Sequence, residues 1–216
     1  MLKRLMEFGI KEKFFDIKTL GKLPKSCCTH SKVEVIDFDQ TKETISKIGL
    51  QYPKSADALK ILPELNRIDF IELKGFQQFI KHFDKQPKNH SHPDETIKNQ
   101  IADFNLSRKI RDSLFILNFL LHHKSFECKQ SEATQFEKAK KGYLIVVDIE
   151  LNKDPIKDRL VTLAFLSKGN LEHKIINQLN NSVSGIPASE LENLEAPKLV
   201  SCKTIDDYYQ RVEFRI

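Results

Sequence analysis

The chain has 216 residues, of which 40% are hydrophobic and 30% are charged, with 35 basic against 30 acidic side chains. This composition excludes a disordered chain and predicts a packed core, while the net charge of +5 is compatible with a polyanionic partner. No run approaches the roughly 20 apolar residues that span a bilayer, and no apolar signal segment opens the sequence. We therefore expect one cytoplasmic domain over residues 1–216 with no membrane partner.

Hydrophobic spacing predicts a helix and then strands in the first third of the chain. An amphipathic helix is expected from the start to about Phe15. Residues 31–39 read as a strand, and the polar residues 39–48 begin a short helix. Strands at 56–62 and 67–74 are separated by PELN, the length of a hairpin turn, which favours an antiparallel pair.

The rest of the chain alternates helices and strands. The predicted elements are a helix at 75–83, an exposed loop at 85–96, a long helix at 101–124, strands at 142–151 and 159–167, a helix near 170–180, a strand at 198–202 and a helix at 204–214. The pattern indicates an α/β fold with a central mixed β-sheet flanked by helices, covered by the N-terminal helix and the long 101–124 helix.

The four cysteines are Cys27, Cys28, Cys128 and Cys202. Their spacing matches neither a zinc finger nor a small disulfide scaffold. We expect reduced thiols, as in most cytoplasmic proteins.

The two strands of the predicted hairpin carry a candidate chemical site. Side chains alternate along a strand, so Glu72 and Lys74 project from one face, and the right hairpin register brings Asp57 beside them. Two carboxylates and a backbone carbonyl, that of Leu73, form a hard oxygen site suited to Mg²⁺ or Mn²⁺. Such an ion beside a phosphodiester polarises the phosphoryl group and activates water, and a fixed lysine balances developing charge.

These residues resemble the PD-(D/E)XK nuclease superfamily, whose pattern is an acid on one strand and an acid-x-lysine on the next. Asp57 matches the first acid, and Glu72 and Lys74 match the second motif, within residues 33–121. Three other acid-x-lysine strings occur, but only this one ends an apolar strand that follows a strand bearing an acid. The resemblance implies a restriction-endonuclease-like core and an Mg²⁺-dependent endonuclease or exonuclease, for which we favour DNA over RNA as the substrate.

The family pattern departs from this sequence at one position and suggests one further residue. Ala56, not the family's usual proline, precedes the first acid. Family members often add a glutamate from the first helix, for which Glu7 and Glu12 are both candidates. The resemblance suits restriction, repair or antiphage defence.

The nuclease hypothesis also predicts contacts with DNA and with a second subunit. A basic run on the long helix, Arg108, Lys109 and Arg111, is a candidate set of phosphate contacts, or the solvated face of that helix. Double-strand cutting from one site per chain calls for a homodimer. A partner subunit that recognises the target is the alternative.

Three other interpretations compete with the nuclease. The strand ending Asp37-x-Asp39 resembles the first motif of haloacid-dehalogenase-type phosphatases, with Asp37 as nucleophile and Asp39 as general acid and base, completed by Lys168 and the pair Asp206 and Asp207. Helix-capping or turn aspartates explain the same string. A non-catalytic module that binds nucleic acid or a partner is the second rival, and a solvated Glu-Lys pair at a strand end is the third.

Overall fold

The fold is described from a computed structural model. It describes residues 1–49, 53–83, 85, 93–151, 163–191 and 193–214, with the backbone alone for 163–170. Among these residues, no helix has both the length and the apolar character needed to cross a membrane.

A six-stranded mixed sheet forms the centre, with its strands in chain order across the sheet. The strands are β1 (Ile17–Thr19), β2 (Glu34–Asp37), β3 (Ala58–Leu62), β4 (Arg67–Lys74), β5 (Lys140–Val147) and β6 (Lys198–Ser201). The first four strands pair antiparallel, and β4, β5 and β6 pair parallel. The connections between the parallel strands carry helices, as such crossovers require. The predicted α/β fold with a central mixed sheet is confirmed.

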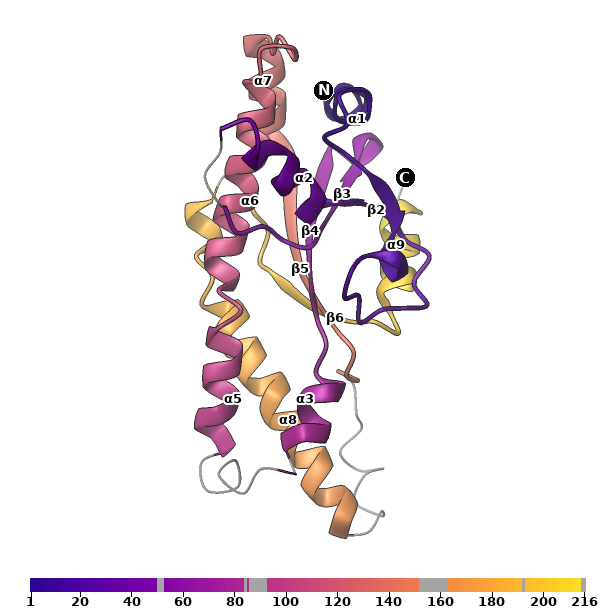
Figure 1. Cartoon of the computed structure of the whole chain (residues 1–216), viewed down its shortest axis with the longest axis vertical. Coiled ribbons are helices and arrows are strands. Elements are labelled where there is room, and N and C mark those ends of the chain that lie inside the picture. Colours follow the sequence, from indigo (N-terminus) through magenta and orange to yellow (C-terminus); the bar gives the residue numbers. More distant parts are fainter. Residues whose placement is uncertain (50–52, 84, 86–92, 152–162, 192, 215–216) are drawn as a thin grey trace.

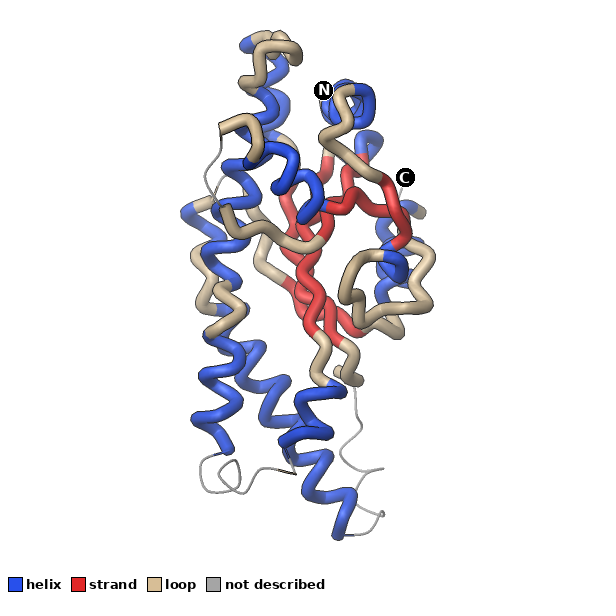
Figure 2. The backbone as a smooth tube through the Cα atoms, in the orientation of Figure 1, coloured by secondary structure: helices blue, strands red, loops and turns tan. Residues whose placement is uncertain are grey.

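Helices flank both faces of this sheet. They are α1 (Leu2–Lys11), α2 (Phe38–Ser46), α3 (Gln77–Phe83), α5 (Pro93–Ala102), α6 (Leu106–Leu121), α7 (Gln130–Lys138), α8 (Leu163–Ser184) and α9 (Ile205–Glu213). Figure 1 shows α6 on one side of the sheet and α9 on the other, and Figure 2 shows the strands enclosed between helices. Short 3₁₀ turns occur at Leu20–Lys22, Pro63–Leu65 and Ala188–Glu190.

Each face of the sheet packs on its own apolar cluster because side chains alternate along the strands. In β4, Ile68 and Phe70 belong to the cluster on the α6 side. Ile71 and Leu73 belong to the cluster on the α9 side. Glu72 shares the α6 side with Phe70 by the same alternation, so the candidate site lies between β4 and α6.

The predicted strand at 159–167 and the predicted loop at 85–96 differ from the structure. The predicted strand at 159–167 is wrong over 163–167, which form the start of α8, and 159–162 lie outside the described residues. A short apolar run has no period that separates a strand from a buried helix. The predicted loop at 85–96 is wrong over 93–96, where Pro93 and two acidic residues open α5, an arrangement that suits a helix N-terminus.

The predicted long helix at 101–124 is divided. Helix α5 ends at Ala102, and α6 begins at Leu106 after Asn105, whose backbone is left-handed with a φ of 52°. Asparagine adopts this conformation more readily than most residues, and the chain turns there. Figure 1 shows α5 and α6 following one another along the same side of the molecule.

The expectation of reduced thiols is wrong for two of the four cysteines. Cys28 and Cys202 form a disulfide, whereas Cys27 and Cys128 are free. The loop between β1 and β2 crosses the α9 side of the sheet, where Leu20 packs in the same cluster as Val200 of β6. This crossing brings cysteines that are 174 residues apart into contact, which no spacing rule can reveal.

Candidate active site

Asp57 and Glu72 face each other across the β3–β4 hairpin. Ala58 pairs with Ile71 in the antiparallel register, so Asp57, one residue earlier, lies opposite Glu72, one residue later. The Leu73 N–H donates to Asp57 Oδ2 at 2.6 Å and fixes that carboxylate beside β4. The predicted hairpin and its register requirement are therefore met.

Two lysines hold the Glu72 carboxylate. Lys74 Nζ lies 2.5 Å and Lys109 Nζ 2.6 Å from Glu72 Oε1. Lys109 Nζ is also 3.6 Å from Asp57 Oδ1, so it lies between the two carboxylates. Lys74 additionally places its ammonium 4.7 Å from the centre of the Phe104 ring, a cation–π contact that restricts where it can move.

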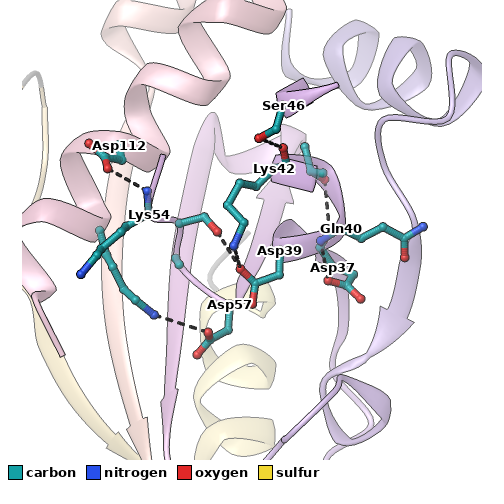
Figure 3. Close-up of polar contacts among 12 residues, drawn as sticks. Asp37, Asp39, Gln40, Lys42, Ser46, Lys54, Asp57 and Asp112 are labelled. Atoms are coloured by element: carbon teal, nitrogen blue, oxygen red, sulfur yellow. Dashed lines mark hydrogen bonds and ion pairs between the residues drawn. The ribbon is translucent and has the colours of Figure 1, made fainter. Parts of the chain in front are cut away.

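Helix α6 positions the segment that carries Asp57. The Lys54 N–H donates to Asp112 Oδ2 at 2.8 Å, a contact drawn in Figure 3, and the Ala56 N–H donates to Ser113 Oγ at 2.9 Å. Asp112 and Ser113 follow Lys109 by three and four residues, so all three project from one helix face. The same face thus anchors the approach to β3 and delivers an ammonium to the acids.

Burial makes Glu72 an unusual carboxyl group. Its side chain has no exposed surface, and Oε2 has no hydrogen-bond partner among the described residues. Desolvation, with the charge of Asp57 adding to it, raises the pKa of Glu72 to about 7, although Lys74 and Lys109 oppose the change. Strongly raised carboxyl pKa values of this kind cluster at functional sites.

The same site alters neighbouring groups. Burial lowers the pKa of Lys109, but the charges of Asp57 and Glu72 raise it by more, so the ammonium form is favoured. Burial, followed by the charges of Glu72 and Asp57, raises the pKa of Tyr143 well above its ordinary value. The Tyr143 hydroxyl, like Glu72 Oε2, has no hydrogen-bond partner within the described part of the chain.

The donor set fits a hard divalent cation. Two carboxylates lie side by side, one oxygen of Glu72 is unpartnered among the described residues, and Asp57 keeps 23% of its side chain exposed, which connects the site to solvent. Lys109 now lies between the acids, and its flexible four-carbon chain would have to move aside. A cation there would also relieve the repulsion that contributes to the raised pKa of Glu72.

The metal-free protein should lose stability as the pH rises, because Glu72 then gives up a proton that the native state binds tightly. The pKa is raised from 4.5 to about 7 on folding, so the native state binds this proton more tightly than the unfolded state. The resulting stability, on the order of 3 kcal/mol, is fully present below the lower value and is lost as the pH rises through the higher one. Urea unfolding in chelator at about pH 5 and about pH 8 should show this loss, and Glu72→Gln should remove it. Equal pH dependence in both proteins would contradict the assignment.

The other predicted site residues differ in whether they contact the two acids. Leu73 contributes its N–H to Asp57, and metal binding by its carbonyl stays a prediction. Glu7 and Glu12 are both exposed on or just after α1. Arg108 pairs with Asp112 and Arg111 with Glu190, and both arginines are more than half exposed. Of the predicted basic run, Lys109 alone contacts the acids, and phosphate contacts by the arginines stay a prediction.

A third acid lies near the site, although the sequence analysis named it only in the phosphatase-like string. Asp39, in the first turn of α2, contributes to raising the pKa of Lys109 and lies beside Asp57 in Figure 3. Its Oδ1 accepts from Lys42 Nζ at 2.6 Å and from Ser55 Oγ at 2.9 Å. No local pattern connects residue 39 with the hairpin, because only the pairing of β2 with β3 brings them together.

The structure favours the capping explanation of the phosphatase-like string. Asp37 caps α2 by accepting from the Gln40 N–H, and it forms an ion pair with Lys18 at 2.8 Å. Asp206, at the start of α9, accepts a hydrogen bond from the hydroxyl of Ser31. Lys168 lies within α8 rather than after a strand, and its side chain is outside what the structure describes.

Comparison with family models, curated proteins and solved structures gives no match for this chain. The functional interpretation therefore rests on the residues and their geometry.

Proposed function

We propose that the protein is a nuclease that hydrolyses phosphodiester bonds in DNA with Mg²⁺ or Mn²⁺. The observation that carries the proposal is the pairing of Asp57 with the buried Glu72, which has an unpartnered oxygen among the described residues and a raised pKa. Lys74 lies against the same carboxylate. Two acids and a lysine thus lie together, a combination that supports phosphodiester hydrolysis assisted by a metal ion.

Each residue has a distinct task in the proposed reaction. Asp57 and Glu72 would hold the ion, which supplies Lewis-acid polarisation of the phosphate and a lowered pKa for attacking water. Lys74, held by Glu72 and Phe104, would place positive charge where charge builds on the phosphate. Lys109 would move from the acids to a phosphate oxygen of the DNA backbone, and the exposed Arg108 and Arg111 would extend that contact along α6.

Cleavage of supercoiled plasmid and of single-stranded DNA, with Mg²⁺, Mn²⁺ or chelator, tests the proposal. Wild-type protein should cut only with metal. Lys74→Ala should cut about 10²- to 10³-fold more slowly, the effect typical of losing one preorganised charge-stabilising group. Asp37→Ala, which removes a helix cap outside the site, should still cut. Absence of cutting together with a phosphomonoesterase activity that Asp37→Ala abolishes would replace the nuclease by the phosphatase.

Lys109 is expected to compete with the metal ion. Its ammonium lies between Asp57 and Glu72, so Lys109→Met should tighten Mn²⁺ binding above about pH 8, where Glu72 is ionised, by about tenfold. Arg108→Met is the matched control, because the neighbouring Arg108 pairs with Asp112 instead. Calorimetric titration with Mn²⁺ measures the difference. Unchanged or weaker binding by Lys109→Met would show that the ammonium does not compete.

The proposed nuclease activity has a consequence for the number of subunits that act together. One active site per chain cuts one strand at a time, so double-strand cleavage would use a homodimer or a partner subunit that recognises the target. Sedimentation with and without duplex DNA would distinguish these from a monomer that nicks.

A further inference from the structure

Three cysteine sulfurs converge on the α9 side of the sheet, the face opposite the one that carries Glu72. Cys27 lies near the end of β4, where burial, followed by the charges of Asp148 and Asp57, raises the pKa of its thiol. Cys27 and Cys28 lie in the loop before β2, and Cys202 follows β6. Cys27 Sγ is 3.5 Å from Cys202 Sγ and 3.9 Å from Cys28 Sγ, and all three sulfurs lie within 4.8 Å of one another. The Cys28–Cys202 disulfide accounts for two of these sulfurs and leaves the third unexplained.

We propose that Cys27, Cys28 and Cys202 bind Zn²⁺ when the disulfide is reduced. A dithiol reductant supplies two electrons and two protons, so the disulfide becomes two thiols while the dithiol forms its own disulfide. Zn²⁺ then binds three thiolates, and the three thiol protons pass to solvent. Thiolates select zinc over the hard cations that suit carboxylates, so this site differs in chemistry from the acid pair and does not depend on the proposed nuclease activity.

The sulfur spacing matches a zinc site. Tetrahedral zinc with Zn–S bonds of about 2.3 Å separates its sulfurs by about 3.8 Å. The two distances from Cys27, 3.5 and 3.9 Å, fall on either side of that value. Reduction lets Cys28 and Cys202 move apart to the same separation. Water would occupy the fourth position.

The surrounding backbone holds the ligands in place. The Cys202 N–H donates to the Val147 carbonyl at 2.7 Å, which continues the pairing of β6 with β5. Cys28 is 3% exposed, and Cys27 Sγ lies 3.9 Å from the Val146 carbonyl. The three cysteines lie in loop and turn residues, with Cys28 buried and Cys27 and Cys202 half-buried, so these contacts with β5 are what hold the sulfurs in place. Bound zinc would link the crossing loop to the far edge of the sheet, as the disulfide does in the oxidised protein.

Cobalt titration of the full chain tests the proposal, because Co²⁺ in a thiolate site shows sulfur-to-metal charge-transfer absorption. Protein reduced with a phosphine, in oxygen-free buffer, should develop this absorption up to a stoichiometric end point, and Zn²⁺ should displace it. Cys27→Ser should weaken binding by more than about 100-fold, since loss of a residue that only supports a ligand already costs about 10- to 100-fold. The oxidised protein should show none of this absorption.

Two matched variants separate this site from others. Cys128→Ser removes a free cysteine outside the cluster, and Glu72→Gln removes a carboxylate of the proposed nuclease site, so both should keep the cobalt absorption. In the reduced wild-type protein, Zn²⁺ should also protect Cys27 from alkylation. Mass spectrometry measures this protection, and the experiment does not depend on the folding of any variant. No absorption in the reduced wild type, full absorption in Cys27→Ser, or no protection by Zn²⁺ would each overturn the proposal.

Discussion

Replacing Glu72 with glutamine is expected to slow metal-dependent DNA cleavage by about three orders of magnitude. Loss of a carboxylate that holds the ion removes several kcal/mol of transition-state stabilisation, and each 1.36 kcal/mol is a factor of about ten in rate. Glutamine has the shape of glutamate, and its side-chain oxygen can still accept from Lys74 or Lys109. The rate of plasmid nicking under saturating Mn²⁺ measures the loss.

Glu64→Gln is the control for this substitution. Glu64 is exposed on the 3₁₀ turn at the other end of the same hairpin. Its replacement removes one carboxylate charge from the hairpin and leaves the residues of the site unchanged. Its cleavage rate should equal that of wild type. A Glu72→Gln protein that unfolds in urea as the wild type does and still cuts at the wild-type rate would refute the proposed role of Glu72.

Replacing Cys202 with serine is expected to lower the free energy of unfolding by about 5 kcal/mol under oxidising conditions in chelator. The Cys28–Cys202 bond spans 174 residues, and a cross-link closing so long a loop removes much of the entropy of the unfolded chain. Urea unfolding of wild type and variant, each fully oxidised, measures the difference.

Cys28→Ser should cost much less than Cys202→Ser. Cys27 Sγ lies 3.5 Å from Cys202 Sγ, so Cys27 can form the replacement disulfide with a loop of nearly the same length. Peptide mapping should find a Cys27–Cys202 bond in the Cys28→Ser protein. Equal losses from the two substitutions would show that Cys27 cannot take this place. Cys128→Ser, at a free cysteine, should leave stability unchanged.

The hairpin and the placement of its acids could be predicted from the sequence, because they depend on residues that are close together in the chain. Alternation along β4 puts Glu72 and Lys74 on one face, and the short turn before Arg67 leaves few registers. The structure adds the register itself, with Ala58 opposite Ile71. The predicted sheet was therefore right in its class, and so was the convergence of Asp57 with Glu72.

Contacts between distant segments were decided only by the tertiary structure. Lys109 reaches the acids because α6 packs over the end of β4, and Asp39 lies nearby because β2 pairs with β3. Cys28 meets Cys202 because a loop crosses the sheet. In the same way, the start of α8 is helical although its apolar run suits a strand. Periodicity and spacing report what neighbouring residues do, whereas these features depend on which elements pack together, and local sequence does not encode that.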